Sequence, residues 1–172
     1  MNITLYEAPI EITFSLVEDN YDELKREFDS LGEADDDPIG NWVKIAKSKG
    51  NAYDTDPILL HLLVEMHRKI DSLQKIIEDK PIKHIPLINQ SNIQSIGYEH
   101  FKINDDVYLD DMRYYGRIAM PTFPQRNVAV FFTKHTENIA KIELMHERDI
   151  KEWDAYVASR ERTMIREMKY VD

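Results

Sequence analysis

Residues 113–134, RYYGRIAMPTFPQRNVAVFFTK, contain two runs of β-branched and aromatic residues. The runs RYYGRIAM and NVAVFFTK have the length and composition of strands, and the break PTFPQRN at 121–127 is rich in turn residues. Similar short runs flank this pair, with KHIPLIN, SIGYEHFKI and DVYL before it and NIAKIELM after it. Several short strands at this spacing predict a small barrel or sandwich over residues 81–147.

The segment that follows the predicted strands, residues 148–172, has the pattern of a helix. Five apolar residues lie roughly on one helical face, and RERTMIREMK places charges of both signs on the other. The five apolar residues are Ile150, Trp153, Val157, Met164 and Met168. Strands followed by a helix predict the α+β class.

Residues 1–54 are predicted to form an acidic N-terminal extension. The run ITLYEAPIEITFSLV at 3–17 alternates in part, but Pro9 argues against a central strand and predicts an edge strand or an extended arm. NYDELKREFDSLG predicts a short amphipathic helix that ends at Gly32. A second short helix is predicted to begin at Asp37-Pro38 and to stop at Gly50.

The clearest single element is a helix predicted over residues 55–80. Asp56 suits the N-cap, Pro57 suits the first helical position, and Pro81 marks the end. Between them, six apolar residues follow the 4-3-4-3-4 spacing of a heptad repeat. We call these six residues the seam: Leu59, Leu63, Met66, Ile70, Leu73 and Ile77.

Two interpretations of the seam remain open. A long amphipathic helix packed on its own domain is the commoner arrangement, but the second half of this helix leaves only a narrow apolar stripe, which favours a coiled coil. In the first half, Leu60 and Leu62 flank the seam and either cover the attached domain or widen the interface. Because a four-helix assembly buries a wider face, the pattern favours a tetramer over a dimer.

Composition argues against several classes of protein. The 172 residues include no cysteine, which excludes disulfides and thiolate metal sites, and no apolar run approaches the length of a membrane span. The chain begins without the pattern of a signal peptide, so a cytoplasmic location is expected. Residues 1–56 hold 14 acidic and 5 basic side chains, and no segment is strongly basic, so a nucleic-acid partner is not expected.

The sequence offers little catalytic or metal-binding chemistry. It contains no nucleophile elbow, P-loop or dinucleotide fingerprint, and His61 and His67 are too far apart on one helix to share a metal ion. We therefore predict a protein that is not an enzyme and that has no metal site. Three arginines on or beside the strands, Arg113, Arg117 and Arg126, are candidate phosphate ligands because a guanidinium binds phosphate in a bidentate manner, although a surface arginine is the commoner role.

The order of these elements resembles that of the PilZ domain family, in particular its tetramer-forming branch in bacteria. The resemblance covers about residues 55–170 and rests on the heptad helix, on N-x-x-x-x-G from Asn92 to Gly97, and on the strands and helix that follow. It implies a six-stranded antiparallel β-barrel with the heptad helix before it and a C-terminal helix after it. It also implies cyclic di-GMP as the ligand of members that carry the binding motifs.

Both binding motifs of that family are altered in this chain. The family uses an RxxxR segment and a (D/N)-x-S-x-x-G segment, but here Gln94 replaces the serine and EDKPIKHIPL supplies only lysines and a histidine. Lysine lacks the planar fork of arginine, so two lost arginines, at roughly 1.5–3 kcal/mol each, predict weak binding or none. The resemblance and the arginines together give these candidate ligand residues: Lys83, His84, Asn92, Gln94, Gly97, Arg113 and Arg126.

Two functional hypotheses follow. In the first, the chain is a divergent PilZ-family protein that acts in cyclic di-GMP signalling as an oligomeric interaction module, with the seam holding the oligomer and an unidentified protein as partner. In the second, it is a true cyclic di-GMP receptor that uses substitute basic residues. A coiled-coil scaffold on an unrelated small barrel is the third interpretation.

Overall fold

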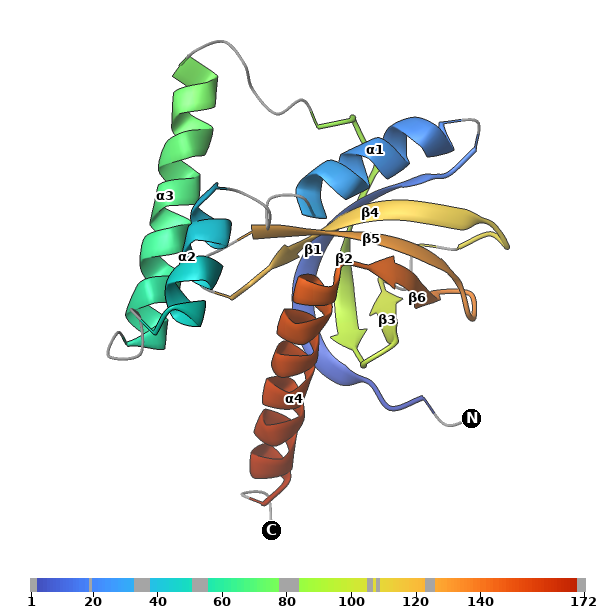
Figure 1. Ribbon diagram of the computed structural model, residues 1–172. Coiled ribbons are helices and arrows are strands. Elements are labelled where there is room, and N and C mark those ends of the chain that lie inside the picture. Colours follow the sequence, from blue (N-terminus) through green and yellow to red (C-terminus); the bar gives the residue numbers. More distant parts are fainter. Residues whose placement is uncertain are drawn as a thin grey trace. The chain divides into compact units, whose positions relative to one another are not determined.

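The computed structural model describes residues 3–18, 20–32, 38–50, 56–77, 84–104, 107, 109–122 and 126–169 (Figure 1). The chain forms two compact units. One comprises Met1–Phe28 together with Pro86–Asp172, and the other comprises Asp29–Ile85. The first unit therefore takes its residues from both ends of the sequence.

The first unit contains a closed six-stranded antiparallel β-barrel, as predicted. Around the barrel the strands follow the order β1-β2-β3-β6-β5-β4, so each strand is hydrogen-bonded on both sides. This closure gives each described strand a neighbour on both sides, which protects strand edges from templating aggregation. The strand bounds are β1 Tyr6–Leu16, β2 Asn89–Ile96, β3 His100–Ile103, β4 Arg113–Met120, β5 Arg126–Lys134 and β6 Ile139–Met145.

The first strand corrects our prediction of an edge strand or arm at residues 3–17. β1 pairs with β2 on one side and with β4 on the other, so the barrel is not confined to residues 81–147. Pro9 is accommodated because it lies where the β1–β2 register shifts between Glu7 and Ile10, and because pairing with β4 begins only at Ile12. A bulge of this kind needs no amide donor from the proline.

Three other predicted strand runs differ from the structure, and in one of them, DVYL, no described residue lies in a strand. KHIPLIN contributes only its last residue, Asn89, to a strand, so β1 replaces it as the sixth strand. SIGYEHFKI is the end of β2, a tight turn and β3, with the Gly97 amide donating to the His100 carbonyl oxygen at 2.7 Å. In the sequence, the end of β2 and the whole of β3 read as one continuous strand. The turn between them contains only one glycine, so it gives a weak turn signal.

The barrel interior is apolar and is closed at one end by α4 (Glu147–Lys169). Trp153 and Val157 of α4 belong to the same buried cluster as the inward side chains of the strands. The indole Nε1 of Trp153 donates a hydrogen bond of 2.9 Å to the Gly97 carbonyl oxygen. This contact fixes α4 to the β2–β3 turn, and burial of the large indole ring anchors the helix.

The outer wall of the barrel carries a second apolar contact, made by α1 (Tyr21–Gly32). Leu24 and Phe28 of α1 are buried, and the Phe28 ring centroid lies 5.4 Å from that of Phe131 on β5. The ring of His146 stacks on Phe28 at 3.8 Å between centroids. These contacts place the start of α1 firmly against the first unit.

A buried polar network lies beneath α1. The Oε1 atom of Glu27 accepts hydrogen bonds from the Tyr115 hydroxyl at 2.8 Å and from Arg117 Nη1 at 2.6 Å. The Glu27 side chain is only 4% exposed and that of Arg117 only 12%. Burial, followed by the contact with Glu27, raises the pKa of Tyr115 far above its usual value, so the hydroxyl remains a donor at neutral pH.

The second unit contains α2 (Pro38–Ser48) and α3 (Pro57–Ile77). α2 ends before Gly50, whose φ of 77° is the left-handed conformation that glycine adopts at helix ends. α3 was expected before the barrel, but it lies between the first and second barrel strands in the sequence. In the described part of the chain, no helix has the length and apolar character needed to cross a bilayer.

Candidate functional site

The seam predicted from the heptad spacing lies on one regular helix. α3 has 21 residues, which at 1.5 Å per residue gives a length of about 32 Å. Its start is fixed as expected, because Asp56 Oδ1 accepts a hydrogen bond of 2.8 Å from the Ile58 amide. The helix is therefore long enough to present three heptads to a partner.

All six seam side chains are exposed to solvent, although all are apolar. Their exposed fractions are Leu59 51%, Leu63 52%, Met66 52%, Ile70 58%, Leu73 58% and Ile77 83%. By contrast, Leu60, Leu62 and Val64 of the same helix are half-buried. A folded chain rarely leaves a continuous apolar stripe of this length in water, and such stripes mark interaction surfaces.

The predicted nucleotide-binding residues on β2 do not form a loop. Asn92 and Gln94 lie within the strand, where Asn92 pairs with Glu11 of β1. The Asn92 side chain is exposed, whereas its neighbour Ile93 is fully buried in the barrel. The stretch that resembles a binding loop is therefore a strand followed by a tight turn.

Gly97 has a structural reason to be glycine. An added Cβ would lie 2.8 Å from the Thr4 carbonyl oxygen and 3.2 Å from a methyl carbon of Leu5. The close approach that glycine permits is thus made by the N-terminal end of the same chain. Both the amide and the carbonyl of Gly97 are also used, by His100 and Trp153 respectively.

Replacing Gly97 by alanine is expected to destabilise the barrel by about 1–3 kcal/mol, because the Thr4 backbone must move away from the new methyl group. Urea denaturation followed by circular dichroism measures this loss. Ser95→Ala, on the same strand and only partly exposed, is the matched control and should change stability by less than about 0.5 kcal/mol. Equal stability of the two variants would contradict the close approach.

Arg113 and Arg126, two of the predicted phosphate ligands, lie far apart, and the third, Arg117, is paired with Glu27. The first two occupy opposite ends of the β4–β5 hairpin, since Arg113 pairs with Thr133 and Arg126 with Met120. Seven residues of strand separate the two positions, or about 23 Å at the rise of a β-strand. They cannot converge on the two phosphates of one small ligand.

Each of these arginines is also engaged by carboxylates. Arg113 Nε lies 2.8 Å from Glu143, and its guanidinium carbon lies 4.9 Å from the Phe131 ring centroid. Arg126 lies 2.6 Å from Asp149 and 2.7 Å from Glu152, both on α4. Burial would lower the pKa of Arg126, but the two carboxylates raise it overall. Arg126 therefore joins β5 to α4.

The structure does not bring the other predicted ligand residues to one place. His84 is exposed and precedes β2 by several residues, and Lys83 lies outside the described residues. Among the residues that the structure describes, no group of three or more histidine, cysteine or acidic side chains is placed to hold a metal ion.

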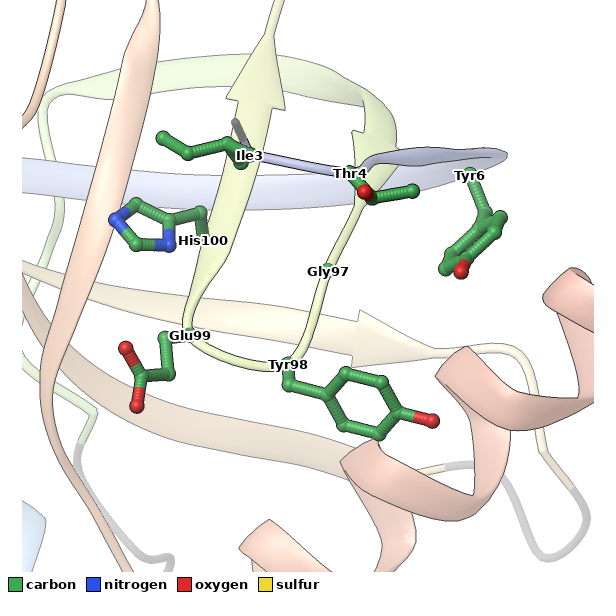
Figure 2. Close-up of a pocket in the computed structure, with 7 residues that line it drawn as sticks. All are labelled: Ile3, Thr4, Tyr6, Gly97, Tyr98, Glu99 and His100. Atoms are coloured by element: carbon green, nitrogen blue, oxygen red, sulfur yellow. The ribbon is translucent and has the colours of Figure 1, made fainter. Parts of the chain in front are cut away.

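A cavity of about 440 Å³ does lie beside Gly97, between the start of β1 and the β2–β3 turn (Figure 2). It is lined by Ile3, Thr4, Tyr6, Gly97, Tyr98, Glu99 and His100. Of these, only Gly97 was predicted as a site residue. The turn sequence Gly-Tyr-Glu-His was visible in the sequence, but its partners at residues 3–6 were not, because that segment was expected to be an edge strand or an extended arm.

No family model matches this chain, and no curated protein or solved structure matches it either. The exposed seam and the cavity are therefore the features of this chain that bear on its function.

Proposed function

We propose that this protein is an oligomeric interaction module that associates through the seam of α3. The observation that carries the proposal is the exposure of all six seam residues, each more than half accessible to solvent. Burying these side chains against another apolar surface would stabilise an assembly by about 1 kcal/mol or more for each residue.

A second copy of α3 is the partner that fits the seam best. The a and d spacing repeats over three heptads, and such a repeat is complementary to itself because each side chain fits a hole between four residues of a like helix. Polar side chains such as Lys69 and Gln74 border the stripe and keep it narrow. The half-buried Leu60 and Leu62 beside it favour four helices over two.

The mass of the protein in solution tests this proposal. Sedimentation equilibrium at low-micromolar concentration should give a multiple of the 20.3 kDa chain, with four chains favoured over two. A chain that stays monomeric at this concentration would contradict self-association through the seam.

For the barrel, we propose a role in bacterial cyclic di-GMP signalling as a divergent PilZ-family protein that contacts a protein partner and binds the nucleotide weakly or not at all. A closed six-stranded antiparallel barrel followed by a helix supports the resemblance. The carboxylate contacts of Arg113 and Arg126 favour this proposal over the alternative, a receptor that uses these arginines as substitute ligands.

Isothermal titration of cyclic di-GMP into the protein is expected to give no saturable heat up to several hundred micromolar, roughly the range of weak non-specific binding. The physical reason is that Arg113 and Arg126 are far apart and already paired with carboxylates. Saturable binding with a Kd below about 10 µM, or roughly −7 kcal/mol, would support the receptor instead.

A further inference from the structure

The cavity beside Gly97 has an unusual balance of charge. None of the seven residues that line it is a lysine or an arginine, and Glu99 is the acidic one. Figure 2 shows the Tyr6 and Tyr98 rings on one side of the β2–β3 turn, and the Glu99 carboxylate with the His100 imidazole on the other. A phosphate or carboxylate ligand would find no cation in this lining.

His100 adds a polar atom without a partner. Its Nε2 is buried and, among the residues described, makes no hydrogen bond. Burial lowers the pKa of His100 below its usual value, and the nearby His135 lowers it further. The imidazole is therefore neutral at pH 7.5, where one ring nitrogen can accept a hydrogen bond.

Tyr98 supplies an exposed aromatic face, whereas Tyr6 is buried in the barrel core and held in position. The Tyr6 hydroxyl donates a hydrogen bond of 2.8 Å to Glu161 Oε1 on α4, whereas Tyr98 is about half exposed. Aromatic faces attract cations, and a nearby carboxylate strengthens that attraction. Glu161 thus places a second negative charge at the Tyr6 hydroxyl.

We propose that this cavity binds the guanidinium or ammonium group of an arginine or lysine side chain presented by a partner protein. The cation would donate to the Glu99 carboxylate beside the neutral His100 ring, with Tyr98 covering its apolar stem. The formal net charge of −10 would favour encounter with a basic partner. This inference rests on the proposed interaction role of the barrel, and it stands whether or not α3 self-associates.

Two basic residues neighbour residues of the cavity, and one of them, Lys141, can distinguish a cationic ligand from an anionic one. Lys141 pairs with His100 across β3 and β6, and its charge contributes to the lowered pKa of that histidine. Arg160 on α4 donates to the Glu7 carbonyl oxygen at 2.6 Å. Lys141 would repel a cationic ligand and attract an anionic one, so removing it distinguishes the two ligand classes.

The experiment is a titration of the ¹⁵N-labelled full chain at pH 7.5, followed by the amide signals of Gly97 and Tyr98. The probes are N-acetyl-arginine amide and its neutral isostere, N-acetyl-citrulline amide. The arginine probe should saturate with a Kd on the order of 1 mM, and the citrulline probe should bind at least about fivefold more weakly. Inorganic pyrophosphate is the anionic probe and should leave both signals unchanged.

Three variants assign the effect to the cavity. Tyr98→Ala and Glu99→Gln should each weaken arginine-probe binding by about two- to fivefold, whereas Lys141→Ala should strengthen it by a similar factor. Glu11→Gln, an exposed carboxylate in the middle of β1, is the matched control and should leave the Kd unchanged. Equal binding of the arginine and citrulline probes, or weaker arginine-probe binding by Lys141→Ala, would overturn the proposal.

A second arm distinguishes a partner side chain from a free amine. A short peptide with one arginine flanked by glycine and serine should bind at least as tightly as N-acetyl-arginine amide, because its backbone adds contacts at the mouth of the cavity. Tighter binding of free arginine amide or of spermidine would overturn the assignment to a protein partner. A monomeric chain that still binds the probes would refute the α3 assembly alone.

Discussion

Replacing Ile70 and Leu73 together by serine is expected to dissociate the oligomer into monomers. Both side chains lie at the centre of the seam, at one a and one d position, and each is 58% exposed in the single chain. An assembly of two or more helices would lose at least four buried aliphatic groups, or about 4 kcal/mol, which corresponds to roughly a thousandfold in affinity. Sedimentation equilibrium at low-micromolar protein measures the change.

Ile58→Ser is the control for this experiment. Ile58 is 79% exposed on the same helix but lies outside the a and d positions, so its loss should leave the mass of the assembly unchanged. Circular dichroism should show both proteins folded, because neither substitution touches the barrel core. If the Ile70 and Leu73 variant remains fully associated, another surface holds the oligomer.

Replacing Glu27 by alanine is expected to destabilise the protein by about 3–5 kcal/mol, the usual cost of breaking a buried ion pair by removing one partner. The carboxylate of Glu27 on α1 is the shared acceptor for Tyr115 and Arg117 of β4. Without it, the guanidinium and the phenol lose that acceptor in a site with little water. Urea denaturation, followed by circular dichroism, measures the loss.

Two further variants separate this network from general effects on α1. Glu23→Ala removes an exposed carboxylate from the same helix and should change stability by less than about 0.5 kcal/mol. The double variant Glu27→Leu with Arg117→Met replaces the pair by apolar groups and should recover most of the loss. A Glu27→Ala protein as stable as Glu23→Ala would show that the network contributes no net stability.

The elements that the sequence predicted well are those set by local signals. The start of α3 follows from Asp56 and Pro57, and the end of α2 follows from Gly50; the structure confirms both. β4 and β5 also follow directly from two runs of strand-forming residues. In each case, the residues that determine the element are neighbours in the sequence.

The elements that the sequence did not predict depend on residues distant along the chain. Pro9 argued against a central strand, but the bulge beside it depends on where β2 and β4 meet β1. Glu27 has the sequence pattern of a solvated helix position, and only the distant Tyr115 and Arg117 explain its burial. Gly97 was identified as a site residue, but the atom that requires a glycine belongs to Thr4.

The separation of β1 from its partner strands has a consequence for how the chain folds. Between Leu16 and Asn89 lie 72 residues, and joining the ends of a flexible loop of that length costs roughly 4 kcal/mol of chain entropy. During synthesis, β1 must wait until β2 and β4 have emerged, whereas α3 can form at once from contacts within 21 residues. The helix that carries the seam can therefore form before the barrel can close, because its contacts are local whereas those of β1 join distant parts of the sequence.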